Sequence, residues 1–191
     1  ADMARDLPAL RIVLDHCGGP IGIGPYAGKR DEVFSAWHTH MRTLAERPNV
    51  MVKLGGLTMS MAGYGWHKLP APPSSAVLAE AMRPWLLACI ELFGVERCMF
   101  ESNFPMDRVS CSYTVLWNAF KRVAGDFSAG ERRALFHDNA VRAYALSLVR
   151  ARLAGSLTSS FPWPRRRSRS ALRPLFGRGA RPRAPCRYSS T

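Results

Sequence analysis

Long hydrophobic runs are absent from this sequence. No apolar stretch approaches the roughly 18 residues that a membrane-spanning helix needs, and the longest candidate, residues 85–93, is interrupted by Glu91. We therefore expect no integral membrane protein. Apolar residues are nevertheless abundant, at 47% hydrophobic and 10% aromatic. A chain of this composition collapses around a core, which excludes a wholly disordered protein.

Cysteine is scarce and follows no recognisable pattern. The five cysteines form no CxxC pair and show no zinc-finger spacing. Because their number is odd and no secretory signal is recognisable, we predict a reduced, cytoplasmic protein. Cys89 and Cys98 are expected to be small buried side chains of the core.

Acidic residues and lysine are both missing from residues 156–191, which contain nine arginines. The preceding residues hold 18 basic and 14 acidic side chains, so they account for +4 of the total charge of +13. Arg, Pro, Ser and Ala without periodicity cannot bury enough surface to offset the entropy of ordering. We predict a folded domain over residues 1–153 and a disordered basic tail over 154–191. A frameshifted extension is one interpretation of this composition.

Three short apolar runs alternate with helical patterns along residues 1–153. This order predicts parallel βαβ units with right-handed crossovers. Three strands leave two open edges, so the pattern indicates part of a larger α/β sheet. Pro84 is expected to kink or split its helix, and Ser128 with Glu131 predicts a capping box. The strands are expected at residues 12–14, 50–54 and 97–102, and the helices at 29–47, 75–93, 113–124 and from Ser128 onward.

Polar residues follow each predicted strand. In parallel α/β folds, active sites gather at the carboxyl ends of the strands, so these residues are expected to meet. Each also has a plainer explanation: His16 as a core histidine, Lys53 as a side chain reaching solvent, and Asp107 as the cap of a turn. In chain order the polar residues are Asp15 and His16, then Lys53, then Glu101, Ser102 and Asn103, with Asp107 just beyond.

Four segments together resemble an amidohydrolase-related family of predicted metal-dependent hydrolases, similar to fuconolactonases and pyrone-dicarboxylate lactonases. They are Val13-Leu-Asp-His-Cys-Gly-Gly-Pro, Val52-Lys-Leu-Gly-Gly-Leu, Arg97-Cys-Met-Phe-Glu-Ser-Asn-Phe-Pro-Met-Asp and Phe136-His-Asp-Asn-Ala-Val-Arg-Ala-Tyr-Ala-Leu. The resemblance covers about residues 9–148. It implies the C-terminal portion of a (β/α)8 TIM barrel, with the three strands as its sixth, seventh and eighth.

The resemblance also implies roles for individual residues. His16 matches a sixth-strand histidine near the metal or the substrate carbonyl. Asn103 stands where the superfamily usually has an aspartate that activates water. An amide cannot accept a proton at neutral pH, so Asn103 can only orient water or substrate. Either Asp107 or Glu101 supplies the carboxylate, or this branch works differently.

The predicted function is hydrolysis of a lactone, carboxylic ester or amide of a small molecule. We assign His16, Asn103 and Asp107 to catalysis, and His67, Tyr64 and Lys53 to substrate binding. His16 is also the candidate metal ligand.

A divalent metal, zinc or manganese, is implied by the resemblance. The superfamily's first-strand His-x-His pair would lie before residue 1. His38-Thr-His40 cannot replace it, because residues two apart in a helix point about 200° apart.

Two other functions stay open. The chain could be an inactive barrel fragment that needs a partner chain. It could also bind nucleic acid or an acidic partner non-specifically through the arginines of residues 154–191, in a salt-dependent manner. Exposed sheet edges would favour a homo-oligomer.

Overall fold

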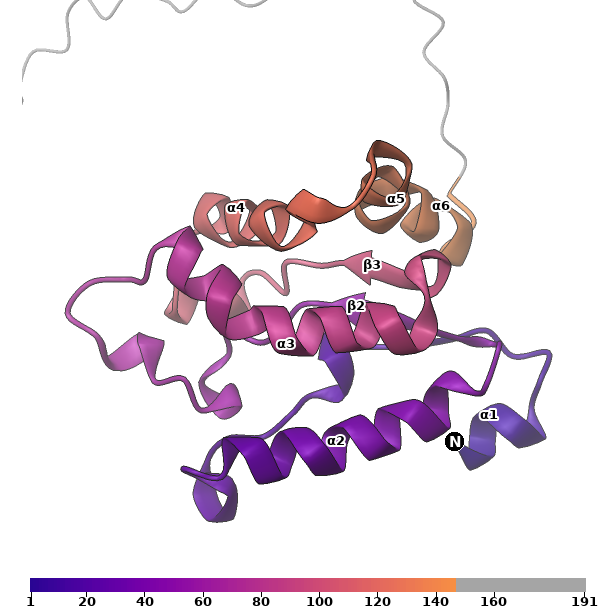
Figure 1. Ribbon diagram of the computed structural model, residues 1–191, viewed down its shortest axis with the longest axis horizontal. Helices are drawn as coiled ribbons and strands as arrows, with labels where there is room; N and C mark the ends of the chain where they lie inside the picture. Colours follow the sequence, from indigo (N-terminus) through magenta and orange to yellow (C-terminus); the bar gives the residue numbers. More distant parts are fainter. Residues whose placement is uncertain (147–191) are drawn as a thin grey trace, which may run out of the picture. The chain divides into compact units, whose positions relative to one another are not determined.

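Three parallel strands form one sheet in the computed structural model, which describes residues 1–146 (Figure 1). The strands are β1 (Ile12–Leu14), β2 (Val50–Leu54) and β3 (Cys98–Phe100), in the order β1-β2-β3. Both neighbouring pairs are parallel. The predicted α/β class with three parallel strands is confirmed. The tail predicted over residues 154–191 lies outside the described residues.

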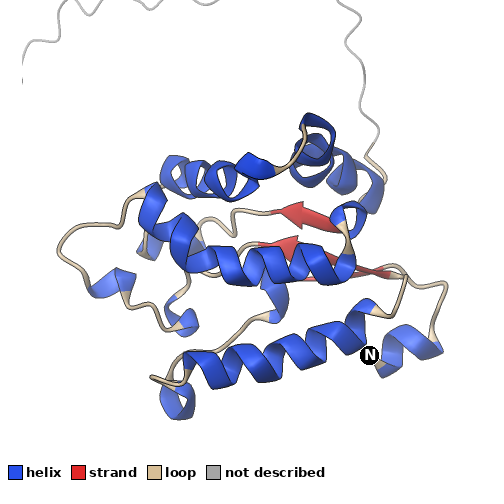
Figure 2. Ribbon diagram, viewed as in Figure 1, coloured by secondary structure: helices blue, strands red, loops and turns tan. Residues whose placement is uncertain are grey.

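Helices occupy most of the rest of residues 1–146 (Figure 2). Short 3-10 turns lie in the connections between them. A single π-helical turn, Ala134–Asp138, joins the last two α-helices. The sequence pattern did not predict this turn. The α-helices are α1 (Asp2–Asp6), α2 (Arg30–Ala45), α3 (Ser75–Phe93), α4 (Tyr113–Val123), α5 (Ala129–Arg133) and α6 (Asn139–Ala143).

Helix α3 connects β2 to β3 and begins and ends at recognisable signals. The Ser74 hydroxyl accepts a hydrogen bond from the Val77 amide, and Gly94 ends the helix with φ +79°. The helix runs unbroken through Pro84, so the split allowed for in the sequence does not occur. Met82 and Leu86 on either side of the proline are fully buried, and this packing offsets the missing backbone hydrogen bond.

The core lies between the sheet and the helices that cover it. Val50, Val52 and Leu54 of β2 are fully buried in one hydrophobic cluster with residues of α3 and α4. Since side chains alternate along a strand, Met51 and Lys53 point to the opposite face of the sheet. The predicted buried cysteines, Cys89 and Cys98, are confirmed members of the core.

The segment after α4 is fixed by polar contacts. The predicted capping box of Ser128 and Glu131 is present at the start of α5. Asn139, fully buried at the start of α6, donates from Nδ2 to the carbonyls of Val95 and Cys98, each at 2.7 Å. These bonds attach α6 to the entrance of β3.

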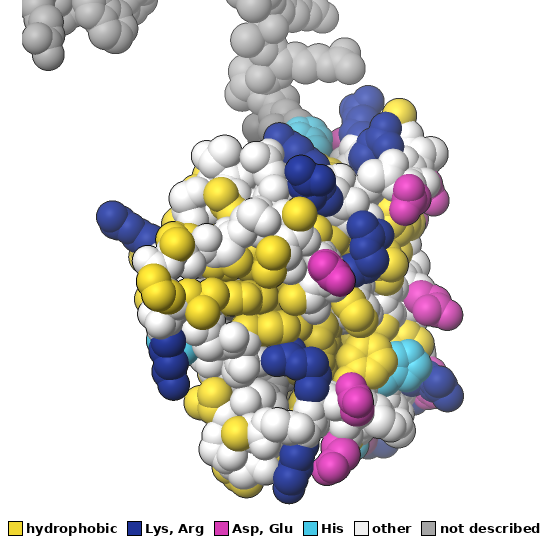
Figure 3. Space-filling model, turned by 60° about the vertical axis from the view of Figure 1, so that its left-hand side comes forward, with side chains coloured by type: hydrophobic (Ala, Val, Ile, Leu, Met, Phe, Trp, Pro, Cys, Tyr) yellow, Lys and Arg dark blue, Asp and Glu magenta, His cyan; other side chains and the backbone are white. Residues whose placement is uncertain are grey.

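One face of the molecule carries a broad band of hydrophobic side chains flanked by charged ones (Figure 3). Within residues 1–146, no helix has both the length and the apolarity required to cross a bilayer.

Candidate active site

His16 and Glu101 form the shortest polar contact among the predicted site residues. The His16 Nδ1 atom lies 2.5 Å from Glu101 Oε1, and the same oxygen accepts the His16 backbone amide at 3.1 Å. His16 follows β1 and Glu101 follows β3, 85 positions apart in sequence. The Glu101 side chain is only 14% exposed. The pair therefore joins the carboxyl ends of the two outer strands of this sheet.

Lys53 links the two acidic residues of the site. Its Nζ atom lies 2.9 Å from Asp15 Oδ1 and 3.6 Å from Glu101 Oε2. Burial alone would lower the pKa of Lys53, but the hydrogen bonds to Asp15 and Tyr144 and the charge of Glu101 raise it above its usual value. Lys53 is thus a permanent cation in this cluster. The Tyr144 ring, 5.8 Å from Nζ, was not predicted as a neighbour.

Two glycines at the end of β2 make room for the pair. A Cβ atom on Gly55 would lie 2.5 Å from Glu101 Cγ, and one on Gly56 would lie 2.6 Å from His16 Cγ. Gly56 also has φ +69°, a conformation that other residues rarely adopt. The Gly-Gly segment therefore allows His16 and Glu101 to approach the backbone of the central strand.

Three non-glycine residues near the carboxyl ends of the strands have positive φ angles. His16, Cys17 and Asn103 have φ values of +56°, +52° and +45°, although none is glycine. The Trp37 indole donates a 2.8 Å hydrogen bond to the Cys17 carbonyl and helps to hold the first of these turns. Non-glycine residues in this region cost on the order of 1–3 kcal/mol each and cluster at functional sites.

Asp107 is fully buried beside this cluster. The Asn103 side chain donates to its Oδ1 atom at 3.4 Å. Among the described residues, Oδ2 of Asp107 has no hydrogen-bond partner, and neither does the buried Thr58 hydroxyl. Burial raises the pKa of Asp107 to about 6, and the neighbouring Thr58 hydroxyl and Asn103 amide lower it only in part. A carboxyl group with a pKa near neutrality can take up and release a proton.

The two aromatic candidates for substrate binding lie in the long loop after β2. The Tyr64 hydroxyl donates to the Ala81 carbonyl at 2.8 Å and accepts from the Trp85 indole at 3.1 Å. Its ring stacks on Trp66 and under Arg30. His67 is exposed in a 3-10 turn. The structure therefore brings together His16, Lys53, Asn103 and Asp107 at the strand ends, whereas Tyr64 is engaged with α3.

The sequence placed Glu101 and Asp15 at strand ends, with Glu101 as one of two candidates for the catalytic carboxylate. Their signal was a polar residue directly after an apolar run: Asp15 follows Leu14, which is level with Val52, and Glu101 follows Phe100, which is level with Leu54. The ion pairs follow from this register.

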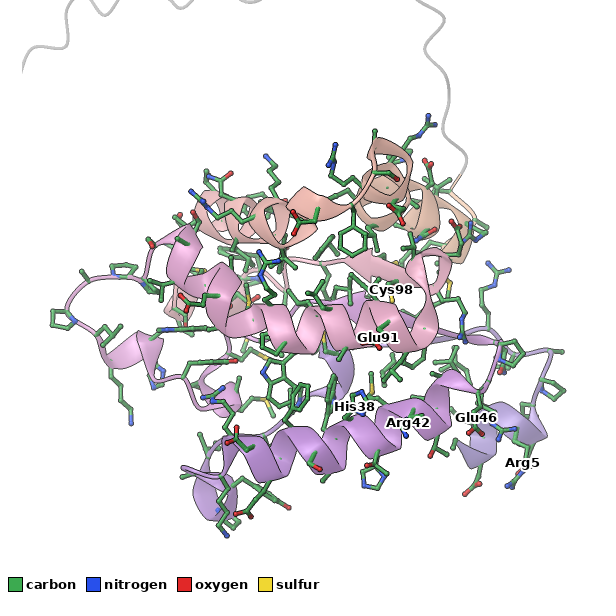
Figure 4. All side chains as sticks on the ribbon, in the orientation of Figure 1. Arg5, His38, Arg42, Glu46, Glu91 and Cys98 are labelled. Carbon is green, nitrogen blue, oxygen red and sulfur yellow. The ribbon has the colours of Figure 1, made fainter. Side chains whose placement is uncertain are left out.

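The described residues do not fit a metal site by themselves. Among residues 1–146, no three His, Cys, Asp or Glu side chains are arranged to hold a metal ion. His38, labelled in Figure 4, stacks on Phe34 of α2, whereas His40 borders a groove beside Leu14. This agrees with the expectation that the two histidines point apart.

Two groups of curated relatives match this chain. Protein y4mH of Sinorhizobium fredii is 41% identical over 143 residues, which cover 75% of this chain and 41% of that protein. The L-fucono-1,5-lactonase of Burkholderia multivorans is 32% identical over 139 residues, covering 71% of this chain and 43% of the lactonase. The chain thus spans less than half the length of these relatives.

A solved structure has a similar fold over the matched part. The crystal structure of an amidohydrolase from Burkholderia multivorans with bound zinc is 30% identical, with a TM-score of 0.64. The match covers 76% of this chain and 48% of that protein. The family model described as Amidohydrolase matches residues 1–146. The matched residues include all three strands of the sheet. The chain therefore belongs to the amidohydrolase family.

Proposed function

We propose that this chain supplies the carboxyl-terminal half of the active site of a hydrolase that opens a lactone of a small molecule. Carboxylic esters and amides of small molecules are the alternative substrates in this proposal. The observation that carries the proposal is the meeting of His16, Lys53 and Glu101 at the ends of three parallel strands. Its substrate class rests on the similarity to L-fucono-1,5-lactonases.

Three residues have distinct roles in this proposal. His16 is about one-third exposed at the strand ends and contacts the reacting groups. Asn103 orients water or substrate through its amide. Asp107, with a pKa of about 6, exchanges a proton with the reacting groups near neutral pH. Lys53 holds Asp15 and Glu101 in place and contributes positive charge beside the substrate.

The proposal is tested with two proteins. The first is the 191-residue chain, and the second is a chimera in which residues 9–146 replace the equivalent part of the Burkholderia multivorans lactonase. Each is assayed by proton release from L-fucono-1,5-lactone, from an aliphatic ester and from an amide, with and without added zinc. We expect the chimera to open the lactone, and turnover by the 191-residue chain alone would show that the upstream half is dispensable.

Matched variants identify the residues responsible. His16→Gln in the chimera is expected to lower kcat/KM by about 10²-fold or more, whereas His40→Gln, an exposed substitution on α2, leaves it unchanged. A folded chimera that hydrolyses none of the three substrates would show that the hydrolase proposal is wrong.

A further inference from the structure

We infer that Glu101 is a positioning residue that fixes His16 in the tautomer with the proton on Nδ1, so that Nε2 offers a lone pair at the strand ends. The inference concerns the ring itself, and only its use in hydrolysis rests on the proposed function. The tautomer determines whether Nε2 of His16 donates or accepts a hydrogen bond.

The hydrogen-bond geometry determines which atom carries the proton. Glu101 Oε1 already accepts the backbone amide of His16 at 3.1 Å, and the ring Nδ1 approaches the same oxygen at 2.5 Å. Because Oε1 accepts the backbone N–H, it is the acceptor for the ring as well, so the Nδ1 atom donates. A neutral imidazole has a single N–H, and the other nitrogen, Nε2, is then an acceptor.

Both carboxylate oxygens of Glu101 have partners in the site. The Glu101 side chain is largely buried, and while Oε1 lies against His16, Oε2 lies 3.6 Å from the Lys53 ammonium. Asp15 in turn holds Lys53 at 2.9 Å from the other side. The four groups form a chain of alternating charge that ends on the imidazole.

Backbone features hold the ring where the carboxylate can reach it. His16 lies in the left-handed region, and Gly56 leaves the space that the ring occupies. A histidine restrained by its own backbone and by a second group is prepared for one role before substrate arrives. This is the arrangement in which an acidic partner selects a tautomer.

The chosen tautomer has a chemical consequence for lactone opening. A neutral ring with the proton on Nδ1 cannot donate from Nε2 to a substrate carbonyl. It can accept a proton from water while the water oxygen bonds to the carbonyl carbon. The same proton then passes to the ring oxygen as the carbon–oxygen bond breaks, so one water is consumed and the histidine is regenerated. Asn103 cannot perform this step, because its amide does not take up a proton.

The test is the nitrogen-15 spectrum of histidine in the full 191-residue chain at pH 8, which is above the usual pKa of histidine side chains, about 6.5. The His16 signals are assigned by their loss in His16→Gln. We expect Nδ1 to carry the proton and Nε2 to resonate as a bare nitrogen. A wild-type spectrum with the proton on Nε2 would overturn the inference without reference to any variant.

Two variants test the cause. Glu101→Ala is expected to release the tautomer, so that the proton is shared between both nitrogens, whereas Glu80→Ala, an exposed change on α3, leaves the spectrum as it was. An unchanged His16 spectrum in Glu101→Ala would contradict the positioning role. If Glu101→Ala does not fold, Lys53→Met provides the second test, because loss of the cation shifts the shared proton from Nδ1 toward Glu101.

Activity is a separate readout. In the chimera, Glu101→Ala is expected to lower kcat by about 10- to 100-fold with a smaller change in KM, and Glu80→Ala to change neither. The expected tautomer in a chimera without turnover would support the positioning of His16 and refute the proposed hydrolysis. Turnover that is unaffected by Glu101→Ala would refute the positioning role alone.

Discussion

At the scale of single residues, Asp107 is a carboxyl group whose charged form is disfavoured by burial. Its pKa is raised to about 6 because it is fully buried. The folded protein therefore binds this proton more tightly than the unfolded chain does between about pH 4 and pH 6. The stabilising contribution of the protonated form is complete below that window and is lost as the pH rises through 6.

Asp107→Asn should therefore make the free energy of unfolding less dependent on pH. The wild type is expected to lose up to roughly 3 kcal/mol between pH 4 and pH 7.5 relative to the variant, from a shift of about two pKa units. Urea unfolding of both proteins across this range measures the difference. Asp126→Asn, at a side chain that is 96% exposed, is the matched control. Equal pH profiles for wild type and Asp107→Asn would contradict the raised pKa.

Gly56 is expected to be intolerant of any side chain. Gly56→Ala places a methyl group 2.6 Å from the His16 ring and forces a residue with φ +69° to carry a Cβ. The expected loss is about 1–3 kcal/mol in the free energy of unfolding, together with displacement of His16. Urea denaturation and the His16 nitrogen signals report the two effects. Gly125→Ala, where a Cβ meets nothing within 4 Å, should change neither.

Sequence reasoning reached the site residues but not their contacts. It located His16, Lys53 and Asn103 at strand ends, because apolar runs ending in polar residues are visible in the chain. The pairing of His16 with Glu101 was not predictable, since it depends on the register of strands 85 positions apart. The engagement of Tyr64 with α3 is equally non-local.

At the scale of elements, Asn139 connects α6 to β3. Its side chain satisfies two backbone carbonyls while fully buried. Asn139→Ala leaves both acceptors without their donor and is expected to reduce the free energy of unfolding by about 2–4 kcal/mol. The exposed change Asn118→Ala on α4 should lie within about 0.5 kcal/mol of wild type. Chemical denaturation distinguishes the two, and an equally small effect of Asn139→Ala would show that this connection is dispensable.

The elements themselves were largely predictable. The capping box at Ser128 is a local signal that the structure confirms. Of the two serines that could cap α3, Ser74 and Ser75, the structure shows Ser74 as the cap. The sequence allowed for a split of this helix at Pro84. The split does not occur, because tertiary packing on both sides of the proline maintains α3. The π turn Ala134–Asp138 has no comparable local signal, and packing of Leu135 into the core accompanies it.

At the scale of the whole molecule, most of the net positive charge comes from residues that lie outside the described ones. Nine arginines lie in residues 156–191, and removing this segment reduces the net charge from +13 to +4. We expect the 191-residue chain to bind duplex DNA weakly, with an affinity that falls steeply as salt increases. A protein ending at residue 155 should lose this binding. Equal affinity of the two proteins in a salt titration would assign nucleic-acid binding to residues 1–155 instead.

The alternation along β2 also determines how this protein can change in length over evolution. Lys53 faces the site only because Val52 and Leu54 face the core. Deleting one residue within the strand would turn the Lys53 side chain toward the hydrophobic core. The Asp15 and Glu101 carboxylates would then lose the Lys53 counter-ion. Insertions and deletions should therefore be confined to the connecting loops, and divergent members should differ in loop length while the strands keep a constant residue count.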